Sequence, residues 1–217
     1  MNRDRPGSPA NIGLSGLMLS LAAVVGFPFY YMIVSTLKTP EEIRVNPLGL
    51  PRDPSFENYA AVLSDPMLLR AFLNTSYITL ATVVLTLAVG SLAAFAVTMR
   101  STWVNRAIGA ALLVAFLVPY QTTLLPLYRF MAGLGLVDHL TGIVAVYSSG
   151  AVLCYFVIVG YMRGLPRELF EAARIDGARP FRMYLSIAIP LVRPVLVTVG
   201  VFQIMAVCND YVSPTVY

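Results

Sequence analysis

The sequence is poor in charged residues, which make up 12% of its 217 positions. Soluble globular domains carry about 25%, so this composition argues against a soluble globule of this size. The chain has one lysine, Lys38, and the residue before it is Leu37. A phosphate-cradling loop of the form G-x-x-x-x-G-K-[ST] requires a glycine at that place. ATP hydrolysis by that route is therefore excluded for this chain.

Potential metal ligands and nucleophile motifs are also scarce. The chain has one histidine, His139, and two cysteines, Cys154 and Cys208, at no spacing typical of zinc or redox sites. The hydrolase motif G-x-S-x-G is missing as well. We therefore predict no metal site, no catalytic residue and no enzymatic activity. The net charge of +4 comes from arginines that flank apolar stretches, so nucleic-acid binding is not predicted either.

Hydrophobic residues, in contrast, make up 58% of the chain. Four stretches contain no charged residue: 6–37, 71–99, 107–128 and 140–162. A fifth, 194–217, contains one, Asp210. A helix needs about 20 residues to cross a hydrocarbon core near 30 Å thick. The runs do not alternate as barrel strands do. We therefore predict an all-α, polytopic membrane protein with five transmembrane helices.

Basic residues set the expected orientation, because cytoplasmic segments carry an excess of Lys and Arg. With the N-terminus in the cytoplasm, the inner segments hold ten basic residues: Arg3, Arg5, Arg100, Arg106, Arg163, Arg167, Arg174, Arg179, Arg182 and Arg193. The outer segments hold five: Lys38, Arg44, Arg52, Arg70 and Arg129. A cytoplasmic N-terminus is therefore predicted, and it places residues 163–194 in the cytoplasm.

The segment 163–194 is much longer than a simple connection between two spans needs. Pro166 suits the first position of a helix, and Gly177 suits the left-handed position just after its end. A second short helix is predicted to begin at Pro180 and to end near Pro190. The sequence thus predicts two short helices on the cytoplasmic surface.

Two roles fit these short helices equally well. Ala172 and Ala173 lie near Asp176 on the predicted helix, and small residues beside a carboxylate let another protein approach closely. The same pattern fits an amphipathic helix lying on anionic lipid. The pattern alone does not decide between docking and lipid contact.

The spacing within this segment resembles a known motif. Residues 171–173 read Glu-Ala-Ala, Gly177 follows after three residues, and 187–190 read Ile-Ala-Ile-Pro after nine more. This arrangement resembles the EAA loop of ABC importer permeases, E-A-A-x3-G-x9-I-x-L-P, with Ile189 where leucine is usual. The flanking residues are similar to the carbohydrate-importer branch, specifically the maltose-type second permease.

The resemblance implies a fold, a site and partners. The fold is a single type I ABC importer transmembrane domain over residues 1–217, in a bacterial or archaeal inner membrane, with 163–194 as its EAA loop. The partners are a second permease subunit, a dimer of ATP-binding subunits, an extracytoplasmic sugar-binding protein and membrane lipid. ATP and Mg²⁺ would be bound by the ATPase, and this chain would hold no cofactor. The implied ATPase-coupling residues are Glu171, Ala172, Ala173, Asp176, Gly177 and Pro190.

The family usually has six spans, so the sequence is expected to lack the last one. Two other interpretations stay open: a membrane scaffold or channel that works without ATP, and a truncated permease that cannot assemble.

Asn209 and Asp210 are the candidates for the substrate pathway. Together with Pro214 they resemble a W-N-D/E-x3-P pattern in a late span, although Cys208 stands where tryptophan is common. An acid inside a span is a functional candidate by default, but at this depth Asp210 also fits a hydrated carboxylate near the outer interface. Three other polar residues in the spans could line a pathway or join helices: Asn74, Gln121 and Gln203.

Overall fold

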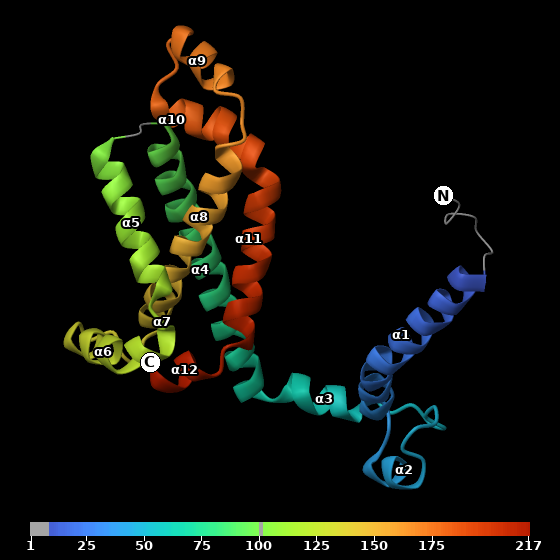
Figure 1. The fold of residues 1–217 in the computed structure, drawn as a ribbon. Coiled ribbons are helices and arrows are strands. Elements are labelled where there is room, and N and C mark those ends of the chain that lie inside the picture. The colour runs from blue at the N-terminus through green and yellow to red at the C-terminus, as the bar shows by residue number, and fades with distance from the viewer. Residues whose placement is uncertain (1–8, 100–101) are drawn as a thin grey trace. The chain divides into compact units, whose positions relative to one another are not determined.

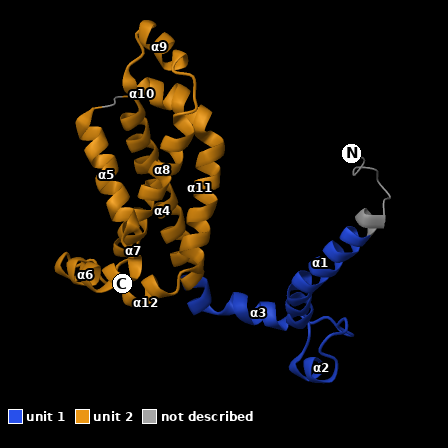
Figure 2. Ribbon diagram, in the orientation of Figure 1, with its two compact units in different colours: residues 1–70 blue, residues 71–217 orange. Residues whose placement is uncertain are grey.

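The computed structural model describes residues 9–99 and 102–217, so Arg3, Arg5 and Arg100 of the topology argument lie outside the described residues. Within the described residues the chain forms helices and connecting segments without any strand (Figure 1). The all-α prediction is confirmed. The chain divides into two compact units, residues 1–70 and 71–217 (Figure 2). The single domain predicted over 1–217 stays a prediction.

The first unit contains three helices: α1 (Pro9–Thr36), α2 (Pro40–Val45) and α3 (Glu57–Ser64). Its apolar helix α1 corresponds to the first predicted span, and large hydrophobic side chains are exposed along it, such as Leu19 and Val24, both at 71%. A helix that is hydrophobic all round is typical of a membrane span. After α1 the chain turns back and covers the side chain of Lys38, which is completely buried.

The second unit is a helical bundle around α4 (Pro66–Met99), whose first turn still belongs to the first unit. The next long helix consists of α7 (Leu140–Tyr147), the 3₁₀ turn η1 (Ser148–Gly150) and α8 (Ala151–Met162). Together with α1 and the helix over Pro180–Asn209, α4 and the helix over Leu140–Met162 make four described helices that are long and apolar enough to cross a membrane.

The predicted span 107–128 is not one continuous helix. It is divided between α5 (Trp103–Leu117) and α6 (Tyr120–Gly133), which are bent by 104° relative to each other. The break lies at Val118 and Pro119, both extended, because proline disfavours helical geometry in the residue before it. Helices α5 and α6 make a fifth span only if the bent pair is counted as one span.

The boundaries predicted for the last span, 194–217, are wrong. A continuous helix runs over Pro180–Asn209, formed by α10 (Pro180–Met183), the π-helix η2 (Tyr184–Ala188) and α11 (Ile189–Asn209). Asp210 therefore lies beyond the helix, before the short α12 (Val212–Val216). The second short helix of 163–194 also does not end near Pro190 but continues into the span.

The π-helix explains how the helix passes Pro190. A proline in a helix has no N–H to donate, and its ring clashes with the carbonyl four residues earlier. Here the N–H of Ile189 donates to the carbonyl oxygen of Tyr184, five residues back. This wider turn gives the proline ring room, so the helix continues where the sequence predicted an end.

Candidate functional site

Helix α9 (Glu168–Ile175) lies at one end of the second unit, and α6 and α12 lie at the other end (Figure 1). Pro166 lies two residues before the helix rather than at its first position, where the sequence placed it. Glu168 and Glu171 occupy its first turn and Arg174 its last. Acidic residues at the start and a basic residue at the end stabilise a helix through its dipole. The charges therefore favour a helix even in so short a segment.

Gly177 ends α9 in the predicted left-handed conformation, with φ of +77°. The N–H of Ala178 donates to the carbonyl oxygen of Ala173 at 2.9 Å, and the N–H of Gly177 donates to that of Arg174 at 3.1 Å. This pair of hydrogen bonds is a Schellman motif, in which glycine avoids the steric cost of positive φ. The turn between α9 and α10 is thus fixed by local backbone geometry.

Aromatic packing joins α9 to the bundle. The Phe170 side chain is 5% exposed, and its ring centroid lies 6.3 Å from that of Phe95 on α4. Phe95 in turn lies 5.5 Å from Tyr184 on η2. The Tyr184 hydroxyl is 2.7 Å from that of Ser91, again on α4. Helix α9 is therefore packed, through Phe170, against a cluster of side chains from two membrane helices.

The structure separates the six candidate coupling residues into two groups. Glu171, Ala172, Asp176 and Gly177 are exposed together on α9 and its C-terminal turn. Ala173 is half-buried and packs against the internal cluster that contains Phe170, and Pro190 lies in the following long helix. One alanine of the pair therefore faces outward and the other faces the protein's own core.

A second polar site is centred on Asp210, after the end of α11. One carboxylate oxygen, Oδ1, accepts hydrogen bonds from the backbone N–H groups of Val212 (2.8 Å) and Ser213 (3.3 Å). The other, Oδ2, accepts from the hydroxyls of Ser213 and Tyr147, the latter at 3.0 Å. Burial by itself would raise the pKa of the Asp210 carboxyl, but the hydrogen bonds from Ser213, Tyr147 and Val212 outweigh it and hold the pKa below its ordinary value. The carboxylate thus attaches α12 to α7.

We expect Asp210→Asn to weaken this attachment by about 1.5–3 kcal/mol, the usual contribution of a hydrogen bond to a charged group. Because the folded-state pKa is lowered, the contribution is present above the unfolded pKa of about 3.9 and is lost as the pH falls through the folded-state value. The Tm difference between wild type and Asp210→Asn should therefore be constant from about pH 5 to 7 and shrink below about pH 4. Asp53→Asn, at an exposed site, is the control. A difference that does not change with pH contradicts the prediction.

The amides of α11 are satisfied within the protein. The Asn209 side chain is exposed and donates to the carbonyl oxygen of Met205 one turn earlier, at 2.8 Å. The buried Gln203 donates to the carbonyl oxygen of Tyr147 at 3.2 Å and so joins α11 to α7. Gln203 could have lined a pathway or joined two helices, and in the structure it joins two helices. Sequence reasoning did not single out Tyr147 or Ser213, because a hydroxyl in an apolar helix has no local signature.

Comparison with known proteins places this fold in a family. Residues 66–216 match the family model described as "Binding-protein-dependent transport system inner membrane component". A probable starch degradation products transport system permease protein, AmyC, from Thermoanaerobacterium thermosulfurigenes is 34% identical over 92% of this chain and 72% of its own length. The melibiose/raffinose/stachyose import permease protein MelC from Bacillus subtilis is 33% identical over 88% of this chain and 71% of its own.

A solved structure shows the same architecture. The crystal structure of a bacterial ABC transporter involved in the import of the acidic polysaccharide alginate matches with a TM-score of 0.82 and 22% identity, over 95% of this chain and 74% of that one. The predicted type I importer fold is thus confirmed, and the relatives are transport permeases rather than enzymes. The chain belongs to the family of inner membrane components of binding-protein-dependent transport systems, and it is a permease subunit of an ABC importer.

Proposed function

We propose that this chain is a permease for a carbohydrate and that α9 couples it to a separate ATP-binding subunit. The printed names of its relatives, which concern starch degradation products and melibiose, raffinose and stachyose, support the substrate class. One observation carries the coupling role: Glu171 and Ala172 are exposed on a helix whose opposite side is anchored to α4 through Phe170.

The exposed residues have distinct parts in this contact. Glu171 provides a carboxylate that can pair with a basic side chain of the ATPase, and Ala172 lets the two surfaces approach closely. Gly177 holds the turn that presents Asp176. Ala173 and Pro190 act as positioning residues, the first by packing inward and the second by shaping the π-helix. Closure of the ATPase dimer would displace α9, and Phe170 would pass that movement to the spans.

The remaining parts of the transport cycle lie with other subunits. ATP and Mg²⁺ bind to the ATPase dimer, a second permease subunit completes the pathway, and an extracytoplasmic binding protein delivers the sugar. The distribution of arginines supports a cytoplasmic N-terminus. For contact with the substrate, Asn209 is a better candidate than Asp210. Asn209 is exposed at the end of α11, whereas the carboxylate of Asp210 is already engaged in the hydrogen bonds that attach α12 to α7.

Charge reversal at Glu171 tests the coupling role. We expect Glu171→Arg to reduce recovery of the ATPase with the purified complex by tenfold or more, because losing one partner of an interfacial charge pair costs about 2–5 kcal/mol. Gly177→Pro should have a comparable effect, since proline cannot adopt φ of +77°. The measurements are co-purification and sugar-stimulated ATPase activity.

Glu41→Arg provides a matched control, because Glu41 is exposed in the first turn of α2, which belongs to the first compact unit. It should leave ATPase recovery unchanged. Normal recovery and normal stimulated ATPase activity in both Glu171→Arg and Gly177→Pro would overturn the coupling role. Sugar uptake that persists with an inactivated ATPase would instead favour a channel that works without ATP.

A further inference from the structure

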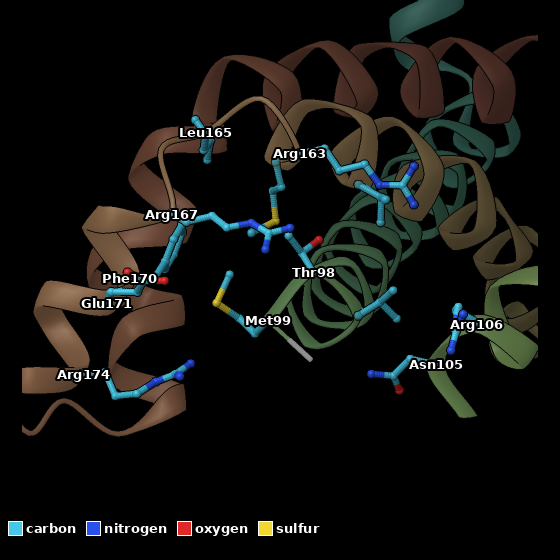
Figure 3. A pocket seen from close by; sticks show the side chains of 13 residues that line it. Thr98, Met99, Asn105, Arg106, Arg163, Leu165, Arg167, Phe170, Glu171 and Arg174 are labelled. Carbon is cyan, nitrogen blue, oxygen red and sulfur yellow. The ribbon is translucent and has the colours of Figure 1, made fainter. Parts of the chain in front are cut away.

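A cavity of about 340 Å³ lies between α9 and the ends of α4, α5 and α8 (Figure 3). Four arginines from three parts of the chain line it: Arg106, Arg163, Arg167 and Arg174. Glu171 is the only acidic residue in the described lining. The described lining thus has a formal excess of three positive charges, which favours an anionic occupant.

The four guanidinium groups are not neutralised by the rest of the bundle. Among the described residues, none of them forms an ion pair or a side-chain hydrogen bond, and Figure 3 shows the Arg167 side chain reaching toward Thr98. Arginine presents several N–H donors in a planar fork that matches the oxygens of a phosphate group. A bound phosphate would relieve the mutual repulsion of these side chains and satisfy their donors.

The other lining residues come from the ends of membrane spans. Val97 and Met99 belong to the last turn of α4, and Val159 and Met162 belong to the last turn of α8. Both helices belong to segments apolar enough to cross a membrane. The cavity therefore lies at the ends of two helices that are apolar enough to cross a membrane, with apolar side chains from those ends on one side and arginines on the other.

We propose that this cavity binds the phosphate headgroup of an anionic phospholipid. Its volume is at the lower end for ligand pockets, which suits a headgroup whose acyl chains lie outside along the spans. An acidic side chain of a protein partner would satisfy the arginines but would not use the apolar part of the lining. Because Arg174 and Glu171 belong to α9, an occupied cavity fixes α9 to the ends of α4 and α8.

Lipid binding is measured on the intact, purified transporter complex. The probes are short-chain phosphatidylglycerol, phosphatidylcholine of the same chain length, and glycerol 3-phosphate as the free phosphate. The test variant is Arg163→Gln/Arg167→Gln. The control is Arg182→Gln/Arg193→Gln, which removes two exposed arginines that do not line the cavity. Native mass spectrometry counts the retained lipid, so the readout does not depend on transport or on ATPase coupling.

We expect phosphatidylglycerol to bind the wild type and the control alike, and the test variant at least tenfold more weakly, since each arginine–phosphate hydrogen bond is of the charge-assisted type. Arg163→Lys/Arg167→Lys should restore part of the binding and shows that the site still folds. Equal binding of phosphatidylglycerol by test and control variants overturns the proposal. If glycerol 3-phosphate binds the wild type as tightly as phosphatidylglycerol does, and the test variant loses that binding too, the ligand is a free phosphate and not a lipid. Loss of ATPase recovery in the test variant with unchanged lipid binding assigns the arginines to the protein partner instead and also overturns it.

Discussion

Replacing Gly90 by alanine is expected to destabilise the helix bundle, although alanine is the better helix former by about 1 kcal/mol. Gly90 lies on the buried side of α4 against α8. A Cβ atom there would lie 2.7 Å from both Cβ and Sγ of Cys154 and 2.9 Å from the carbonyl oxygen of Ala151. Cys154 is completely buried, so the added methyl group can be accommodated only if α4 and α8 move apart. Overpacking of this kind costs about 1–3 kcal/mol, and Gly90→Leu should cost more.

The matched control is Gly160→Ala on α8, where an added Cβ would meet nothing within 4 Å. This substitution should keep or raise the Tm of the purified protein, because only the helix propensity changes. Thermal unfolding in detergent, followed in parallel for both variants, measures the difference. Equal Tm values for Gly90→Ala and Gly160→Ala would show that the close approach of α4 and α8 does not limit stability.

Composition and run length were sufficient to predict where most membrane helices lie. Charge-free runs such as 71–99 and 140–162 became long helices because only a helix satisfies its own backbone hydrogen bonds in an apolar medium. The effect of each proline was not predictable in the same way. The helix pair α5 and α6 is bent at Pro119, whereas Pro28 lies inside α1 and Pro190 is accommodated by a π-helix. Tertiary packing and local backbone adjustment decide between these outcomes, and neither is encoded at the proline itself.

Local chemistry likewise predicted only part of the candidate site. Gly177 could be placed in the left-handed conformation because the requirement concerns one residue and the helix just before it. Ala173 packs inward against a cluster that includes Phe95 of α4, an element distant in the sequence. The hydrogen bond from Tyr147 to Asp210 joins residues 63 positions apart. Patterns with helical spacing carry no information about such contacts.

Replacing Lys38 by glutamate is expected to open the segment between α1 and α3. Lys38 is completely buried, and its Nζ donates to the carbonyl oxygens of Asn46 at 2.7 Å and Gly49 at 2.5 Å. A carboxylate in this position would face two acceptors, and a buried charge without a partner is not tolerated. Lys38→Met should have a smaller effect, because it leaves the two carbonyl oxygens unpaired at about 1–3 kcal/mol each without adding a buried negative charge.

Amide hydrogen exchange over residues 39–56 measures this opening. Other bonds hold the same segment, such as that from the N–H of Ser55 to the carbonyl oxygen of Leu37 at 2.9 Å, and they should break together with the lysine contacts. Exchange should therefore be fastest in Lys38→Glu and intermediate in Lys38→Met. Arg44→Glu, a charge reversal at an exposed position of α2, should exchange like the wild type. If Arg44→Glu opened the segment as much as Lys38→Glu, net charge rather than the two carbonyl contacts would control its folding.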